Sequence, residues 1–521
     1  MFDQSITGHI INKIWTHVEN SLLISLILRL CLRLKADFDS SRVYKILSAV
    51  CRFIKNQYDV SFLKSFVNSG EPVHRAYQNS LLCALVCFVM NIITKLCGRV
   101  MGFAQRIASG SIVHSVLTSG AVTFYGVFAF LVAFMMVCPH EMWNNLYALI
   151  FALGLGGWYL ARVYAGKEKA EFKNINFGLV VFILFASLIS ALSYAQKDAL
   201  RIMLFVYTAV VFGLLMSKAA NTEEKLLTML KIMCAAVAVT SVFGIAQRFM
   251  GIEVNPEYVD VNTSGNMPGR IFSTFANPNN FAELLVLFMP LTMALVLVLK
   301  SSKQKAFFAV CFVLDIVAIA MSYSRSCWVA LVLSILVMLL VYDWRLLVPL
   351  GIVAIVAVPL LPESILDRIL STGSLNDSSN SYRLYIWTGA LRVLKNFFVS
   401  GLGAGPENFT SYYRPLAEFR AITAPHSHMI YMELIIEFGI FAAIGFFGYF
   451  ASVMKKAFAC VGKASRQLKA VIGAAAGSMV GMLFVCAAEY VWFYPRDMFV
   501  FWIVLGIIAC STALTVKNNR D

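Results

Sequence analysis

The sequence predicts an all-α polytopic membrane protein, and three observations support this prediction. Hydrophobic residues make up 60% of the 521-residue chain and charged residues only 14%, with a mean hydropathy of +0.75. Soluble domains carry about 25% charged residues. Apolar runs of about 18–22 residues recur, and each is long enough to cross about 30 Å of hydrocarbon. Because the runs are continuous rather than alternating, we expect helices and not a barrel.

The first 110 residues differ from the rest of the chain. Arginines interrupt the apolar stretch SLLISLILRLCLRLK on a near-helical period. This pattern predicts a basic extension, residues 1–110, with interfacial amphipathic helices on an anionic membrane surface. The run Leu81–Ile93 is short and carries Asn91, so it is interpreted as interfacial or re-entrant, with a true span as the alternative.

About twelve transmembrane helices are predicted in residues 111–521, which form the membrane domain. Their approximate positions are 118–138, 143–163, 175–195, 199–217, 226–249, 280–299, 306–322, 326–342, 346–361, 429–453, 469–489 and 497–516.

Lysine and arginine gather in alternate connections, as the positive-inside rule requires. With residue 1 in the cytoplasm, the basic connections near 162–173, 218–225, 300–305 and 455–469 lie inside, as do both termini. A large loop at about 362–428, between spans nine and ten, and a second at about 250–279 lie outside. Loops of this length are usually functional. The net charge of +15 is thus a signal of topology, and we expect the lipid bilayer, not nucleic acid, as the partner.

Two outer connections place an arginine beside a helix start. In PGRIFSTFANPNNFAE, Asn277 caps a helix whose first residue is a proline, with Asn279 in the exposed first turn and Arg270 just upstream. In SYSRSCW, Ser324 can cap the next helix beside Arg325. A helix N-terminus beside a guanidinium binds anions. The alternative is an ordinary capped helix with a snorkelling or paired arginine.

The large loop is predicted to hold a helix that starts at Ser381. Its Arg383 and Trp387 share a face at i, i+4 spacing, and the glycines of GLGAG read as a tight turn that ends the helix. A further stretch, TAPHSHMIYMELIIEFG, places His426 and His428 at the start of span ten. A helix that starts at His426 puts His426 on a face with Glu437 and turns His428 elsewhere, so only one histidine is expected to do chemistry.

These residues together suggest glycosyl transfer. Arg270, Arg325 and Arg383 would converge on a diphosphate outside the membrane. A neutral histidine at a helix N-terminus can act as a general base. The i, i+2 spacing of the histidines argues against a shared metal, and no cofactor is expected. The alternative for the histidines is a pair of interfacial polar residues.

The order and combination of these motifs resemble the family of O-antigen ligases and polymerases of bacterial membranes. The resemblance covers about residues 200–450 and implies a GT-C-like fold that acts on an undecaprenyl-diphosphate-linked glycan. It implies an active site on the outer face of the cytoplasmic membrane, and a glycan, lipid or protein acceptor.

The resemblance assigns roles residue by residue. The catalytic histidine falls on His428, the diphosphate-binding arginines fall on Arg270 and Arg325, and the loop arginine falls on Arg383. Met429 stands where the family has asparagine, so His426 remains a candidate. Asn277, Asn279, Ser324, Trp387 and Glu437 are supporting candidates. The alternatives are a transporter or flippase of the same lipid-linked glycan, or a protein O-oligosaccharyltransferase.

Overall fold

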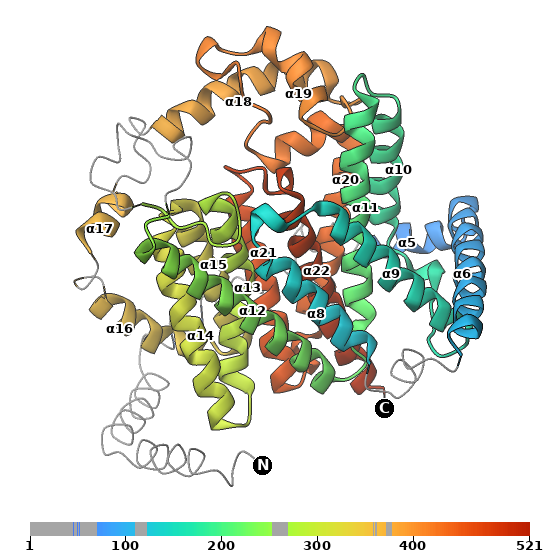
Figure 1. Ribbon diagram of the computed structural model, residues 1–521, viewed down its shortest axis with the longest axis horizontal. Helices are drawn as coiled ribbons and strands as arrows, with labels where there is room; N and C mark the ends of the chain where they lie inside the picture. Colours follow the sequence, from blue (N-terminus) through green and yellow to red (C-terminus); the bar gives the residue numbers. More distant parts are fainter. Residues whose placement is uncertain are drawn as a thin grey trace. The chain divides into compact units, whose positions relative to one another are not determined.

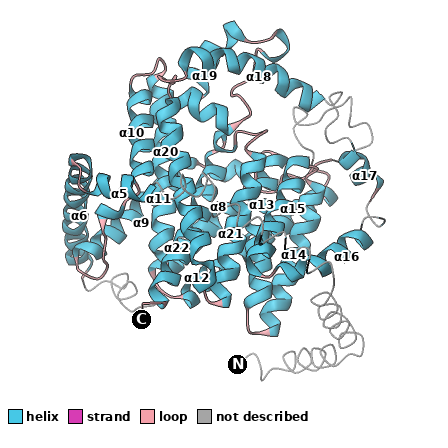
Figure 2. Cartoon of the chain, turned by 180° about the vertical axis from the view of Figure 1, so that it is seen from behind, coloured by secondary structure: helices cyan, strands magenta, loops and turns pink. Residues whose placement is uncertain are grey.

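The computed structural model describes residues 70–109, 122–252, 269–357, 362–370 and 378–520, with Lys45, Ala49, Arg52 and Pro359. The chain divides into two compact units. The smaller comprises Met1–Gly70 and Trp344–Pro359, and the larger comprises Glu71–Asp343 and Leu360–Asp521. The amphipathic helices predicted in residues 1–69 lie almost wholly outside the described residues. Where the chain is described, it forms helices and turns without a strand (Figure 2).

The larger unit holds the helices that build the membrane domain (Figure 1). Those that precede the large loop are α5 (Gly70–Gln78), α6 (Leu81–Ala108), α8 (Phe124–Val137), α9 (Asn145–Tyr164), α10 (Phe177–Ala191), α11 (Gln196–Ala219), α12 (Glu223–Phe249), α13 (Pro278–Val298), α14 (Ser302–Met321) and α15 (Arg325–Tyr342). Those of the loop and beyond are α17 (Glu363–Leu370), α18 (Ser378–Phe397), α19 (Pro406–Tyr413), α20 (Ile430–Cys460), α21 (Arg466–Val485) and α22 (Pro495–Asn518). The smaller unit contributes α16 (Leu347–Ala357).

Ten of the described helices are long and apolar enough to cross a membrane. This confirms the prediction of a polytopic helical membrane protein. Three further apolar helices are shorter. One of them includes α16, which occupies most of the range predicted for the ninth span, residues 346–361. The helix α6 has 28 residues, whereas the sequence favours a short interfacial or re-entrant segment at Leu81–Ile93. Asn91 does not end this helix, because the apolar pattern resumes after it, and the spanning alternative is the one that its length favours.

Small residues let the central helices approach closely. In α21 the glycines Gly473, Gly477 and Gly481 recur every four residues and face α15. A Cβ atom at Gly477 would lie 2.2 Å from the carbonyl oxygen of Ser334. In lipid, where no hydrophobic force separates helices from acyl chains, such close backbone packing is what drives association. The closely packed pair α15–α21 therefore lies against the buried helix α13.

The helix α20 breaks near its start, and the large loop fills the break. Gly439 has φ +71°, which a residue with a Cβ rarely adopts. The amides of Leu402 and Gly403 donate to the carbonyls of Ile436 and Glu437 at 2.8 Å each. These bonds pair the two carbonyl groups that the kink would otherwise leave without a hydrogen-bond donor. The glycine turn after α18, predicted from GLGAG, is thus confirmed and also locks the loop onto a span.

Candidate functional site

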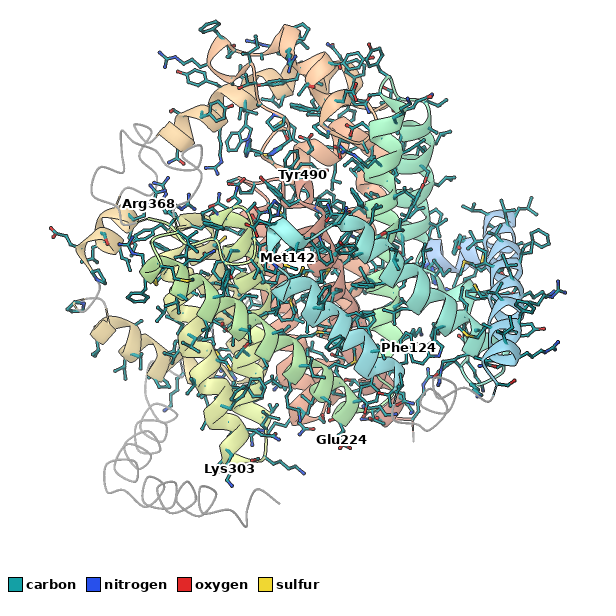
Figure 3. All side chains as sticks on the ribbon, viewed as in Figure 1. Phe124, Met142, Glu224, Lys303, Arg368 and Tyr490 are labelled. Atoms are coloured by element: carbon teal, nitrogen blue, oxygen red, sulfur yellow. The ribbon has the colours of Figure 1, made fainter. Side chains whose placement is uncertain are left out.

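The predicted site residues gather at one end of the larger unit. In Figure 3, Tyr490 and Arg368 lie toward one end of the bundle, and Lys303 and Glu224 lie at the opposite end. The starts of α13, α15 and α20, the helix α18 and the segment that joins α21 to α22 meet at the first end. The charge pattern of the sequence predicts that Lys303 and the site arginines lie on opposite sides of the membrane. In the structure, Lys303 and the arginine-bearing site do lie at opposite ends of the bundle.

The start of α13 forms the first part of the site. Asn277 is the N-cap, and its side chain accepts from the amide of Asn279 at 2.8 Å, with Pro278 at the first helical position. Arg270 donates through Nε to the carbonyl of Ser322 at 2.8 Å and through Nη2 to Oδ1 of Asn279 at 2.7 Å. The predicted cap is confirmed, and it orients Asn279 to hold Arg270.

The start of α15 adds a second arginine. Arg325 is the first helical residue and Ser324 occupies the N-cap position, as predicted. The Ser324 hydroxyl, however, makes no capping bond to a backbone amide of α15, so the predicted capping bond is wrong. Burial first, and then the positive charges of Arg368 and Arg325, lower the pKa of Arg270 to about 10. Arg368, on α17, was missed because its loop has no helix-start motif around it.

Glu489 joins the two sides of the site. This residue lies after α21, and its Oε1 accepts from Arg383 Nη2 and, at 3.3 Å, from Asn279 Nδ2. Its Oε2 lies 3.2 Å from Nδ1 of His428. Burial alone would raise the pKa of Glu489, but Arg383 and the histidines outweigh it and hold the pKa at about 2. Glu489 is therefore ionised throughout the physiological range.

Sequence reasoning missed Glu489 altogether. It sits in CAAEYVW, as the last residue of the predicted span 469–489 and without a motif of its own. The signal that could have found it is charge pairing. Three guanidiniums converging in a partly buried site need a nearby carboxylate, since unpaired buried charge is costly.

The histidines are arranged differently from the prediction. The helix α20 begins at Ile430, with Met429 as its N-cap, and not at His426. Because residues 426–429 form a turn, the two imidazoles do not point apart, and their ring centroids lie 4.1 Å from each other. His426 is buried and His428 is partly exposed toward Glu489. The prediction that His426 shares a helical face with Glu437 is therefore wrong.

Glu437 supports the site from a distance. Its Oε1 accepts from the amide of Gly405 at 2.9 Å, and its Oε2 accepts from the hydroxyl of Tyr490 at 2.6 Å. Tyr490 follows Glu489 directly in the chain. Glu437 therefore holds both the glycine turn and the segment that carries Glu489, which is a structural role beside the chemistry.

The helix α18 brings the large loop over the site. It begins at Ser378 and not at Ser381, because three further polar residues join its first turn. Ile386, Ala390 and Val393 are buried in a small core with Phe409 and Tyr413, and Trp387 packs against that core. Arg383 and Trp387, one turn apart, each keep a buried nitrogen without a hydrogen-bond partner, at Nε and Nε1 respectively. Both nitrogens are donors that a ligand oxygen could satisfy.

Comparison with known families finds one match within the chain. The family model described as O-Antigen ligase matches residues 310–447. The match covers about a quarter of the chain and supports the predicted resemblance to the O-antigen ligase and polymerase family. No curated protein matches it. The matched O-antigen ligase region includes Arg325, Arg383 and both histidines, whereas Arg270 and Glu489 lie outside it and join the same site through the fold.

The match supports a general class for the protein. The ten long apolar helices and the matched region support a multi-pass membrane protein of polysaccharide biosynthesis, with O-antigen ligase or polymerase activity in general, which is transfer of glycosyl groups. In the part of the chain that the structure describes, no group of three or more histidine, cysteine, aspartate or glutamate side chains is arranged to hold a metal ion.

Proposed function

We propose that this protein transfers a glycan from an undecaprenyl-diphosphate carrier to an acceptor hydroxyl, on the outer face of the cytoplasmic membrane of a bacterium. The observation that carries the proposal is the continuous network Arg270–Asn279–Glu489–His428, with Arg383 bound to the same carboxylate. It puts a candidate base next to a set of guanidiniums, which is what transfer from an anionic lipid carrier requires.

His428 is the proposed general base. The ionised carboxylate of Glu489 beside Nδ1 favours a proton on that nitrogen and leaves Nε2 free to accept one. In the reaction, the acceptor oxygen forms a bond to the anomeric carbon while its proton passes to Nε2 of His428. The bond from the anomeric carbon to the diphosphate oxygen breaks, and the oxygen leaves with the electron pair.

The arginines are proposed to hold the diphosphate. Arg270, Arg325 and Arg383 supply the positive charge that binds the anionic diphosphate before, during and after the transfer. Arg270 is already oriented by Ser322 and Asn279, so little ordering is needed when the donor binds. Trp387 extends the same face of α18 toward the sugar.

Two purified variants test the proposal in lipid nanodiscs with an undecaprenyl-diphosphate glycan and a soluble sugar acceptor. We expect His428→Ala to lower turnover by about 10³-fold or more, because it removes the base. We expect Arg325→Ala to raise the KM for the donor. Wild-type turnover in both variants would refute the proposed roles. A lipid-linked glycan transporter would instead move the glycan across the bilayer in all three proteins without forming a new glycosidic bond.

The proposed face of the membrane has its own test. Single cysteines introduced at positions next to Arg325 and Arg383 should react with an impermeant thiol reagent added to the outside of intact spheroplasts. Labelling only after the cytoplasmic side is opened would overturn the outer-face assignment. A cysteine next to Lys303, at the opposite end of the bundle, is the matched control and should show the reverse pattern.

A further inference from the structure

His426 lies next to the proposed base and is less accessible than it. It is only 6% exposed, while the side chain of His428 is 24% exposed. The His426 ring lies against Phe493, with centroids 4.3 Å apart, and its edge approaches Tyr490. An acceptor hydroxyl can therefore reach the ring of His428 more readily than that of His426.

The backbone at His428 has a conformation that needs support. Its φ is +51°, in the left-handed region that residues with a Cβ rarely adopt. Such a conformation is energetically unfavourable and persists only where the surroundings hold it. The turn His426–Met429 must therefore be held by contacts outside its own backbone.

Side chains hold two successive amides of this turn. The amide of His428 donates to Nδ1 of His426 at 3.1 Å, and the amide of Ser427 donates to Oε2 of Glu433 at 2.6 Å. In the first bond, the side chain of His426 accepts from the backbone amide two residues further along the chain. Asparagine and aspartate form the same pattern in Asx turns.

We propose that His426 is a positioning residue, whose ring Nδ1 holds the backbone of His428 in its left-handed conformation and so aims the imidazole of His428 at Glu489 and the acceptor. The inference rests on the proposed function, in which His428 takes the proton. The proton of His426 stays on Nε2 throughout the reaction, because Nδ1 is occupied as an acceptor.

The surroundings of His426 agree with this role. Burial and then the neighbouring His428 hold the pKa of His426 well below its usual value, and Arg383 acts in the same direction. Glu489 is the group that opposes them. The ring of Tyr490 and that of Phe493 close the remaining sides. A neutral imidazole with an unprotonated Nδ1 is the species that the hydrogen bond needs.

Two substitutions at one position test the inference. In His426→Asn the amide oxygen can accept from the same backbone N–H, as in an Asx turn, while His426→Phe keeps an aromatic ring against Phe493 but has no acceptor. We expect His426→Asn to keep kcat within about threefold of wild type. We expect His426→Phe to lower kcat by about 100-fold with the donor KM unchanged, since a misplacement of about 1 Å costs that much.

The outcomes separate positioning from proton transfer. Loss of turnover in His426→Asn as severe as in His428→Asn overturns the inference, because asparagine can replace an acceptor but not a base. Full activity in His426→Phe also overturns it. Thermal unfolding and size-exclusion chromatography in detergent show whether each variant is folded, and an unfolded Phe variant leaves the comparison of the two asparagine variants decisive.

A measurement without turnover keeps this inference distinct from the proposed function. In protein labelled with ¹⁵N-histidine, the signal lost in His426→Asn identifies the ring nitrogens of His426. We expect an unprotonated Nδ1 and a protonated Nε2 between pH 6 and about 8, where free histidine with its pKa of about 6.5 would titrate. A protonated Nδ1 overturns the inference even if the wild-type protein proves to transfer no glycan.

Discussion

The arginine side and the histidine side of the site are built in different ways. Arg270 and Asn279 lie within one short segment at the start of α13, and a helix cap that follows local rules orients them. His428, Glu489 and Arg383 come from three segments that are far apart in the sequence, and a left-handed backbone and a shared carboxylate hold them. The first arrangement supplies fixed positive charge, and the second supplies an oriented base.

This difference predicts two kinds of mutational effect. Changes on the histidine side should act on kcat, because the orientation of the base matters only in the transition state. Changes on the arginine side should act largely on donor KM, because the donor diphosphate carries its charge before, during and after the transfer.

The largest effect is expected from Glu489→Gln. The amide keeps the size of the side chain but removes the charge that favours a proton on Nδ1 of His428 and that pairs with Arg383. We expect kcat to fall by about 10³-fold, as when the carboxylate that orients a catalytic histidine is neutralised. Steady-state kinetics with the nanodisc assay measure it. A normal kcat with a raised donor KM in Glu489→Gln would contradict the assignment of kcat effects to the histidine side and KM effects to the arginine side.

The next effect is expected from Arg270→Gln. Glutamine can still bond to Asn279 or to the Ser322 carbonyl, but it has no charge for the diphosphate. A hydrogen bond to a charged group contributes about 1.5–3 kcal/mol, so the donor KM should rise by about 10- to 100-fold. The kcat should change by less than the KM. A fall in kcat with an unchanged KM would place Arg270 on the catalytic side.

A smaller effect concerns stability against pH. An exposed glutamate has a pKa of about 4.3, and that of Glu489 is about 2 in the folded protein. Because the folded pKa is depressed, its stabilising contribution is complete above about pH 4.3 and disappears as the pH falls toward 2. We expect the difference in melting temperature between wild type and Glu489→Gln to shrink as the pH falls from 4 toward 2. A difference that stays unchanged from pH 4 to pH 2 would contradict this depressed pKa.

The sequence predicted the parts of this site that follow from local chemistry. Asn277 before a proline, Arg325 at the first turn of a helix and Arg383 one turn before Trp387 could each be read from a few neighbours. Glu489 could not, because its role depends on the turn between α21 and α22 and on partners more than 60 residues away. The start of α20 was misplaced for a related reason. Pro425 suits a helix start. Instead, Nδ1 of His426 and the carboxylate of Glu433 accept hydrogen bonds from the backbone amides of residues 428 and 427, and these bonds hold an irregular turn.

The smallest predicted effect isolates the cap of α13. In Asn277→Ala the amide of Asn279 loses its acceptor, which costs about 1 kcal/mol of stability. The matched control is Thr222→Ala, which removes the cap of α12 near Glu224, at the other end of the bundle. Both variants should melt at slightly lower temperature. Only Asn277→Ala should also raise the donor KM, by a few-fold, because the loosened first turn holds Arg270 through Asn279. An equal effect of both caps on KM would show that the start of α13 acts only through overall stability.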